Sequence, residues 1–143
     1  MITVKIKRAK DAKLPAYAHK GDSGVDFYAT EDMMLEPMKI GLIPTGISIA
    51  IPEGYEAQIR PKSGLALNHG IAFVNSPGTI DSGYRGEVKI IAINLGAKPY
   101  HVEKGKKIAQ MVFAKVEHAN FLEVGTLDET ARNHGGFGST GLQ

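Results

Sequence analysis

The chain has 143 residues and a mass of 15.4 kDa, which suits one domain with a core of its own. Its 17 basic and 15 acidic residues leave a net charge of only +2, which argues against a nucleic-acid partner. Cysteine is absent, which excludes a disulfide framework and a thiolate nucleophile and permits a reducing, cytoplasmic compartment.

Period-two alternation of apolar residues predicts short strands along most of the chain. The N-terminal stretch alternates over residues 2 to 6 and lacks the continuous apolar run of a signal peptide or membrane span. Alternation recurs at Val25 and Phe27, over residues 47 to 51, and less regularly over residues 108 to 113. Turn signals separate these segments. The pattern predicts an all-β sandwich or barrel, and we expect a cytoplasmic protein with no membrane partner.

Two segments depart from this alternation. Residues 63 to 70, "SGLALNHG", predict one short helix in which Ser63 is the N-cap and Gly70 ends the last turn. Residues 88 to 95, "VKIIAINL", carry apolar side chains on both faces of a predicted strand. Either another layer or a second copy of the chain covers the outer face, or the strand is buried inside one sandwich.

The composition changes after residue 128. The final "RNHGGFGSTG" has almost no aliphatic side chains, so we expect residues 1 to 128 to form the core and residues 129 to 143 a flexible arm. A frayed terminus would have the same composition. Alternatively, Arg132 and the glycine amides could bind anions while Phe137 contacts a flat ring.

Motifs for nucleophilic or metal chemistry are weak. The five histidines have no ligand spacing, a GxSxG motif is absent, and "GKKIA" lacks the spacing of a Walker loop. The candidate sites are small polar loops within residues 22 to 26, 60 to 64, 78 to 84 and 105 to 110. In the third loop, Asp81 is either a turn former bonded to backbone amides or a carboxylate at the mouth of a site.

The polar loops and the tail, in this order, closely resemble the five motifs of the trimeric dUTP pyrophosphatase (dUTPase) family. The matching segments are "DSGVDFYA", "RPKSGLA", "NSPGTIDSGYRGE", "GKKIAQM" and "RNHGGFGSTG", spanning about residues 20 to 141. The resemblance implies a jelly-roll-like β protomer, a homotrimer with shared active sites, and Mg²⁺-dependent hydrolysis of dUTP to dUMP and pyrophosphate. Such an activity would keep uracil out of DNA and supply dUMP for thymidylate synthesis.

The resemblance also implies roles for the residues of the third motif. Asp81 matches the aspartate that orients and deprotonates the water attacking the α-phosphorus. Tyr84 matches the tyrosine under the deoxyribose, whose ring would leave no room for a 2′-hydroxyl. Asn75 matches the asparagine that reads uracil with an amide donor and acceptor. The substrate pocket would be completed by Gly78, Thr79, Ile80 and Lys89.

Phosphate contacts are implied for the second and fourth motifs. Ser63 and Gly64 match residues that contact the α- and β-phosphates, and Gln110 matches a further phosphate contact. Lys62 stands where arginine is usual, and lysine keeps the charge but loses the planar fork. Mg²⁺ would be held mainly by triphosphate oxygens and waters, while Asp26 is either a structural acid or an outer-shell residue of that ion.

The tail motif would close over the substrate. Arg132 would hold the γ-phosphate and Phe137 would stack on uracil, while Gly138, Ser139 and Thr140 would close over the phosphates. An ordered arm would exclude water other than the nucleophile.

Two other functions are weighed against this one. Deamination of dCTP on the same fold is disfavoured, because the related family carries a glutamate near the position of the apolar Ile91. A trimeric nucleotide-sensing or protein-binding module without enzyme activity is disfavoured by the intact Asp81, Tyr84 and tail motif.

Overall fold

The computed structural model describes residues 1 to 137 and residue 139, and this part of the chain forms ten strands and one helix. The strands are β1 (Lys5–Arg8), β2 (Val25–Tyr28), β3 (Met33–Leu35), β4 (Ile40–Ala50), β5 (Tyr55–Pro61), β6 (Ile71–Phe73), β7 (Gly78–Ile80), β8 (Glu87–Asn94), β9 (Tyr100–Val102) and β10 (Lys107–Lys115). The helix is α1 (Ser63–His69).

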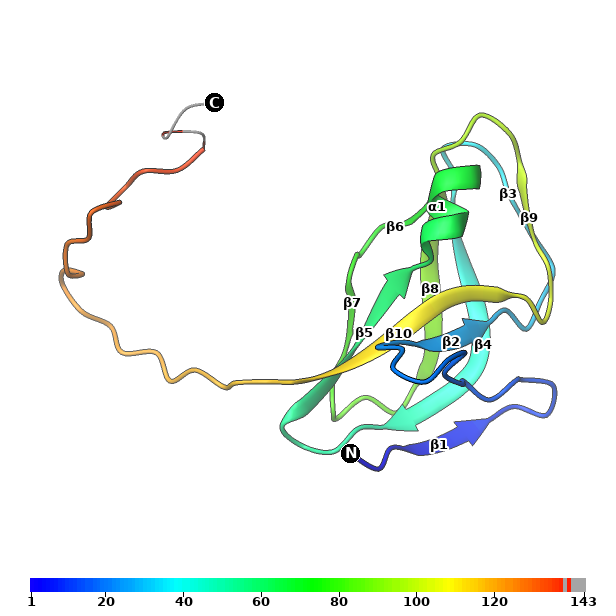
Figure 1. Cartoon of the computed structure of the whole chain (residues 1–143), viewed down its shortest axis with the longest axis horizontal. Coiled ribbons are helices and arrows are strands. Elements are labelled where there is room, and N and C mark those ends of the chain that lie inside the picture. Colours follow the sequence, from blue (N-terminus) through cyan, green and yellow to red (C-terminus); the bar gives the residue numbers. More distant parts are fainter. Residues whose placement is uncertain (138, 140–143) are drawn as a thin grey trace.

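Two four-stranded sheets form a sandwich (Figure 1). One sheet has the order β1-β4-β8-β6 and the other β2-β10-β5-β7, while β3 and β9 form a separate antiparallel pair. Every pairing between these strands is antiparallel, as in sheets that close over a common core. The prediction of an all-β fold with one short helix is confirmed.

The core lies between the two sheets. Ile47 and Ile90 from one sheet, with Phe27 and Met111 from the other, are each about 1% exposed. Burying an aliphatic or aromatic side chain of this size contributes about 2 kcal/mol to stability. The alternation over residues 47 to 51 therefore corresponds to side chains of β4 that alternate between the core and the more exposed face, whereas β2 buries three residues in succession and β10 buries Ile108 and Ala109 together.

Strand β8 is buried on only one face. Val88, Ile90 and Ala92 point into the core, whereas Ile91 and Ile93 on the opposite face are only half-buried. The outer face continues onto neighbouring strands, because cross-strand partners share a face and Leu42 of β4 stands opposite Ile91. Burial of β8 inside one sandwich is thus wrong as an interpretation, and nothing in the described residues covers this face fully.

Helix α1 ends as predicted but begins differently. Gly70 is the C-cap with a φ of 69°, a left-handed conformation that favours glycine. A Cβ there would also lie 2.6 Å from the Gly96 nitrogen. The N-cap is Lys62 in extended conformation, without a side-chain cap, so the prediction of Ser63 as N-cap is wrong by one residue.

A break in the β4–β8 pairing is held by a carboxylate. The register shifts between Pro44 and Ser48, and Gly46 within this break has a φ of 65°. The Gly46 nitrogen donates a 2.8 Å hydrogen bond to Glu87 Oε1 at the start of β8. Glu87 therefore ties the irregular part of β4 to the strand that follows the Asp81 loop.

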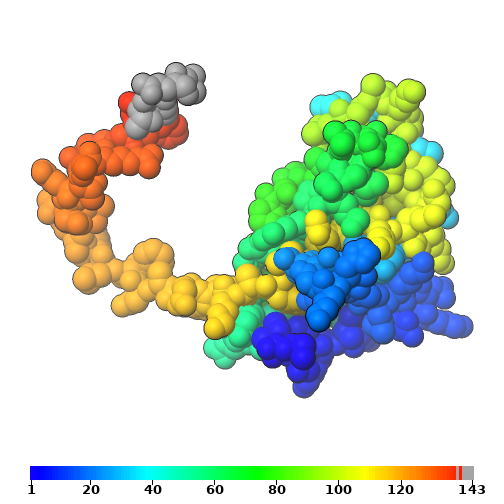
Figure 2. All heavy atoms as spheres, in the orientation of Figure 1, coloured from blue at the N-terminus to red at the C-terminus, as the bar shows by residue number. Residues whose placement is uncertain are grey.

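The chain leaves the sandwich after β10. Residues 117 to 134 are all exposed, and Figures 1 and 2 show this segment extending away from the body. We call residues 117 to 128 the linker segment and residues 129 to 143 the arm. The linker segment carries large apolar side chains that are at least half exposed, namely Phe121, Leu122, Val124 and Leu127.

No helix in the described part of the chain is long and apolar enough to cross a membrane.

Deleting residues 129 to 143 should leave the melting temperature within about 2 °C of the wild-type value, because the described arm residues bury little against the body. Thermal unfolding followed by circular dichroism would measure this. A loss of more than about 8 °C, well above the shift expected from surface changes, would mean that the arm is part of the folded core.

Candidate functional site

A pocket of about 420 Å³ lies beside the loop that joins β7 to β8. It brings together five predicted substrate-site residues, namely Thr79, Ile80, Asp81 and Tyr84 of the third motif and Lys89 just after it. Four further residues line it that the sequence analysis did not select, namely Leu42, Glu87, Val88 and Ile91. Glu87 is the last residue of the third motif, and Val88 and Ile91 belong to the apolar segment that follows it, whereas Leu42 had no sequence signal. We call this cavity the hairpin pocket.

The loop around Asp81 is held by bonds that do not involve its carboxylate. The Tyr84 nitrogen donates to the Asp81 carbonyl oxygen at 3.1 Å, and Tyr84 Oη donates to the Glu87 carbonyl oxygen at 2.9 Å. Arg85 Nη1 donates to the carbonyl oxygens of Ser82 and Tyr84. Asp81 is exposed, and within the described residues no group donates a hydrogen bond to its carboxylate. The carboxylate is therefore not a turn-forming acceptor.

Asn75 and Gly78 lie just before the pocket. Gly78 is buried, and a Cβ there would come within 3.2 Å of Asn75 Nδ2, so the asparagine amide packs directly against this glycine. Asn75 itself is exposed and is not among the residues that line the hairpin pocket.

A second group of predicted residues gathers around Asp26 on β2. Asp26 is 5% exposed, and Lys62 Nζ lies 2.6 Å from its Oδ1. Lys107 Nζ, which the sequence analysis did not select, lies 2.6 Å from Oδ2. Gln110 stands opposite Asp26 on β10 and donates from Nε2 to the Pro61 carbonyl oxygen at 3.1 Å. We call Asp26, Lys62, Lys107 and Gln110 the lysine cluster.

The charges of this cluster stabilise one another. Burial would raise the pKa of Asp26, but hydrogen bonds from Lys107 and Lys62 outweigh it and hold the pKa of this carboxyl below its usual value. The hydrogen bond to Asp26 in turn raises the pKa of the Lys107 ammonium. Asp26 and Lys107 are therefore both charged at neutral pH.

Ser63 and Gly64 follow Lys62 at the start of α1 and are exposed. No heavy atom of the described chain outside the neighbouring residues lies within 4 Å of a Cβ built on Gly64. A ligand could therefore approach the backbone at Gly64 closely.

The hairpin pocket and the lysine cluster lie at different levels of the same sheet. In the antiparallel pairing of β5 with β7, Ile80 stands opposite Ala57, so Asp81 continues towards the start of β5. Lys62 lies five residues beyond Ala57 in the other direction, which at about 3.3 Å per residue is about 16 Å along the strand. One chain therefore does not bring Asp81 and Lys62 to a common point.

The described arm residues lie away from both groups (Figure 1). Arg132 Nε donates to the Gly135 carbonyl oxygen at 2.7 Å, a contact within the arm itself. Phe137 and Ser139 are exposed. The predicted residues Gly138 and Thr140 lie outside the described part of the chain.

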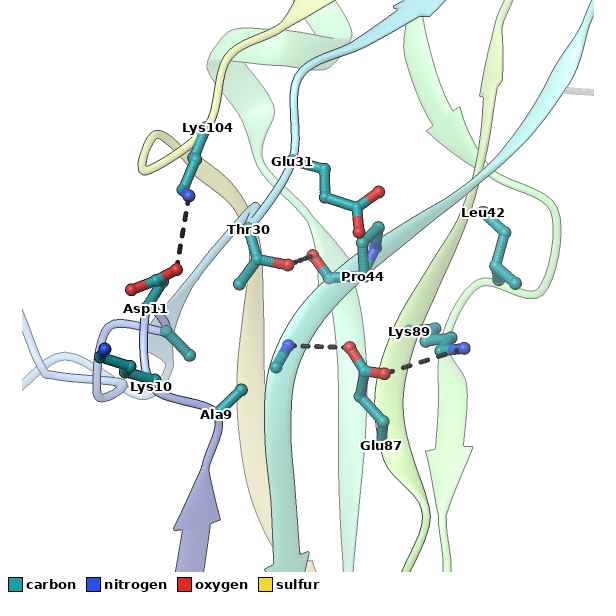
Figure 3. Close-up of a pocket in the computed structure, with 12 residues that line it drawn as sticks. Ala9, Lys10, Asp11, Thr30, Glu31, Leu42, Pro44, Glu87, Lys89 and Lys104 are labelled. Carbon is teal, nitrogen blue, oxygen red and sulfur yellow. Dashed lines mark hydrogen bonds and ion pairs between the residues drawn. The ribbon is translucent and has the colours of Figure 1, made fainter.

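A second cavity, of about 630 Å³, contains only one predicted site residue, Lys89 (Figure 3). It shares Leu42, Glu87 and Lys89 with the hairpin pocket. Glu87 Oε2 lies 3.7 Å from Lys89 Nζ. Another cation of the wall, Lys104, faces an acid as well, so the lysine cluster offers anions a better site than this cavity.

The described residues offer no preformed metal cage. They contain no cluster of three His, Cys, Asp or Glu side chains that could hold an ion. Both Asp26 carboxylate oxygens already contact an ammonium group, so direct ligation by Asp26 would require a lysine to move. The residues present fit an Mg²⁺ ion only if another molecule supplies most of its oxygen ligands.

The chain is similar to known proteins over nearly its whole length. The dUTPase family model matches residues 10 to 141. The deoxyuridine 5'-triphosphate nucleotidohydrolase of Clostridium tetani (strain Massachusetts / E88) is 59% identical over 140 residues, which is 97% of each chain. The match in sequence and the fold together define the class, and the chain belongs to the dUTPase family. The resemblance of the five motifs is confirmed.

Solved structures agree in fold. The dUTPase of Staphylococcus bacteriophage 80alpha, solved with dUPNHPP, is 27% identical with a TM-score of 0.92, and the match covers 99% of this chain and 100% of that one. A variant dUTPase from phage phi11 of S. aureus, described with a structural Mg(II) ion, is 24% identical with a TM-score of 0.81. That match covers 87% of this chain and 98% of the phage chain.

Asp26→Asn should lower the free energy of unfolding by about 2 kcal/mol at neutral pH, because the charge-assisted bonds to two lysines weaken. The folded pKa of Asp26 lies below its ordinary 3.8, so its contribution is complete above that pH and is lost as pH falls through the folded pKa. Urea unfolding of both proteins between pH 3 and 7 would measure the difference. A gap that stays constant below pH 4 would contradict the ion-pair assignment.

Proposed function

We propose a mechanism for the dUTP nucleotidohydrolase activity of this protein, in which the reaction takes place at a site shared between subunits of a homotrimer. The enzyme is a dUTP diphosphatase that releases dUMP and pyrophosphate. One subunit would supply the hairpin pocket with Asp81, a second would supply the lysine cluster, and an arm would close over both. We place the reaction in the cytoplasm, as expected from the sequence.

The distance between Asp81 and Lys62 in one chain is the observation that carries this proposal. A general base must lie about 2.6 to 3.2 Å from the water that it activates. Ser63 and Gly64, next to Lys62, would contact the same α-phosphate that this water attacks. Groups more than about 16 Å apart along one sheet cannot both do so, whereas groups from two chains can meet. The strand register therefore supports a shared site.

The outer face of β8 is the surface on which a second copy would dock. It consists of apolar side chains that are exposed or half-buried, namely Ile40, Leu42, Val74, Ile91, Ile93 and Leu95. A contiguous apolar face of this kind on a soluble enzyme favours association with another protein surface. Leu42 and Ile91 also line the hairpin pocket, so a subunit on this face would border the pocket. The second-copy interpretation of "VKIIAINL" is the one that we retain.

Uracil and deoxyribose would occupy the hairpin pocket. Backbone groups at Thr79, Ile80 and Lys89, with the Asn75 amide behind Gly78, would read the base edge. The ring of Tyr84, fixed by its bond to the Glu87 carbonyl oxygen, would lie under the sugar and exclude a 2′-hydroxyl. The exposed Asp81 carboxylate would orient the attacking water and accept its proton.

The triphosphate would lie against the lysine cluster and the start of α1. Lys62, the backbone at Ser63 and Gly64, and Gln110 would contact phosphate oxygens. Mg²⁺, when bound, would neutralise charge on the phosphates and would be held mainly by their oxygens and by water, with Asp26 no closer than its outer shell. The bonds from two lysines to Asp26 support this outer-shell role or a structural one.

The arm would complete the site from a neighbouring subunit. The exposed apolar residues of the linker segment, such as Phe121 and Leu122, would pack on another copy and bring the arm across. Arg132 would then hold the γ-phosphate, Phe137 would stack on uracil, and the residues from Gly138 to Thr140 would cover the phosphates. Closure would exclude bulk water from the reacting centre.

Asp81→Asn should reduce kcat at least about 100-fold while dUTP binding changes little, because the amide keeps the shape and loses the base. Pyrophosphate release with dUTP and Mg²⁺ would measure turnover, and calorimetry with a non-hydrolysable analogue would measure binding. Asp128→Asn, in the exposed linker segment, is the matched control and should keep wild-type turnover. Turnover of the Asp81 variant close to that of the control would exclude the proposed base.

A further inference from the structure

We infer that Lys107 is a positioning residue for substrate binding: by pairing with Asp26 it leaves the positive charge of Lys62 available to the triphosphate. The inference rests on the phosphate-binding role that we propose for Lys62. Lys107 belongs to the lysine cluster, but the mechanism described so far gives it no contact with the substrate.

The Asp26 carboxylate is shared evenly between two ammonium groups. Each lysine Nζ lies 2.6 Å from a different carboxylate oxygen. The Asp26 side chain is 8% exposed, whereas those of Lys62 and Lys107 are 29% and 44% exposed. Both cations therefore reach solvent, where an anion can approach, and the acid that holds them does not.

The charges of these three side chains do not cancel. One carboxylate and two ammonium groups leave a net charge of +1 next to the start of α1. Without Lys107, the negative charge of Asp26 would cancel the positive charge of Lys62. A phosphate at Lys62 would then lie near a carboxylate and meet no excess positive charge. Like charges at such distances repel strongly in a partly buried site. Lys107 thus affects the phosphate through Asp26 and Lys62.

A β-bulge aims Lys107 at Asp26. The register of β10 on β2 shifts between Lys107 and Ala109, so that Lys107 stands opposite Tyr28 and the buried Ile108 is the extra residue. Tyr28 lies two positions from Asp26 and shares its face. Without the extra residue, Lys107 would point to the other face of the sheet. Bulges commonly re-aim a side chain next to a functional site, which is the effect seen here.

The neighbouring Lys106 provides a matched control. Its side chain is 70% exposed, and its Nζ lies 3.9 Å from Glu103, outside the lysine cluster. Replacing either lysine by methionine removes one positive charge from the same stretch of β10 and its preceding turn and keeps an unbranched side chain. Of these two lysines, Lys107 contacts Asp26 and Lys106 does not.

The first test measures affinity for a non-hydrolysable dUTP analogue by calorimetry without divalent cations, and KM and kcat with Mg²⁺. Lys107→Met should raise Kd and KM about tenfold, the effect of one charge-assisted contact. The value of kcat should stay within about threefold, because the loss of excess positive charge at Lys62 weakens the binding of substrate and transition state alike. Lys106→Met should leave all three values within about twofold. Lys107→Arg, which keeps the charge, should retain most of the affinity.

The second test removes the acid as well. If Lys107 acts by offsetting Asp26, the double variant Asp26→Asn with Lys107→Met should bind the analogue more tightly than Lys107→Met alone, since Lys62 is again the excess charge. If Lys107 had only a packing role, the double variant should bind the analogue more weakly than Lys107→Met, because the losses of affinity from the two substitutions would add. Thermal unfolding of each variant would exclude global loss of structure as the cause.

The outcomes separate this inference from the role of Lys62. If Lys62→Met weakens binding but Lys107→Met does not, the inference is wrong and the phosphate role of Lys62 stands. If Lys62→Met leaves affinity unchanged, the proposed phosphate role fails and the inference fails with it. A double variant that binds more weakly than Lys107→Met, or an arginine variant as weak as the methionine variant, would also overturn it.

Discussion

The antiparallel register of β5 and β7 is the constraint on which this account depends. It sets Ile80 against Ala57 and thereby places Asp81 and Lys62 towards opposite ends of one sheet. Because the rise per residue of a strand is fixed, no side-chain rotation closes a gap of more than about 16 Å. The dUTPase motifs therefore divide into two groups on the folded chain, although they follow one another closely in sequence. In the proposed mechanism a single chain presents both groups, and a second copy completes each site.

Charge pairing explains how the lysine cluster, the proposed phosphate side of the site, keeps an excess positive charge in a chain with a net charge of only +2. Two of the three lysines that line the 630 Å³ cavity face acids, since Lys89 faces Glu87 and Lys104 faces Asp11. At Asp26 the lysines outnumber the acids, because one buried carboxylate contacts two lysines. An excess charge at one place attracts an anion more effectively than a larger number of balanced pairs.

The sequence predicts the elements of this fold better than their relative placement. Period-two alternation identified the strands around Phe27 and Ile49, and Gly70 marked the end of the helix, because these signals are local. The bulge that aims Lys107 at Asp26 was visible only as irregular spacing in residues 108 to 113. The contact between Glu87 and Gly46 joins distant segments and left no local pattern. Motif order likewise carries no information on the distance between Asp81 and Lys62.

The most direct test of the shared site is complementation between two inactive proteins. Asp81→Ala and a chain lacking residues 129 to 143 would be mixed in equal amounts, unfolded and refolded together, and dUTP hydrolysis would be compared with that of wild-type protein. If Asp81 and the arm of each site come from different chains, random assembly restores about a quarter of the sites. A working site needs Asp81 from a truncated chain and an arm from an Asp81→Ala chain, and each of these has a probability of about one half. If both come from one chain, mixed oligomers confirmed by mass would remain inactive, and the account would be contradicted.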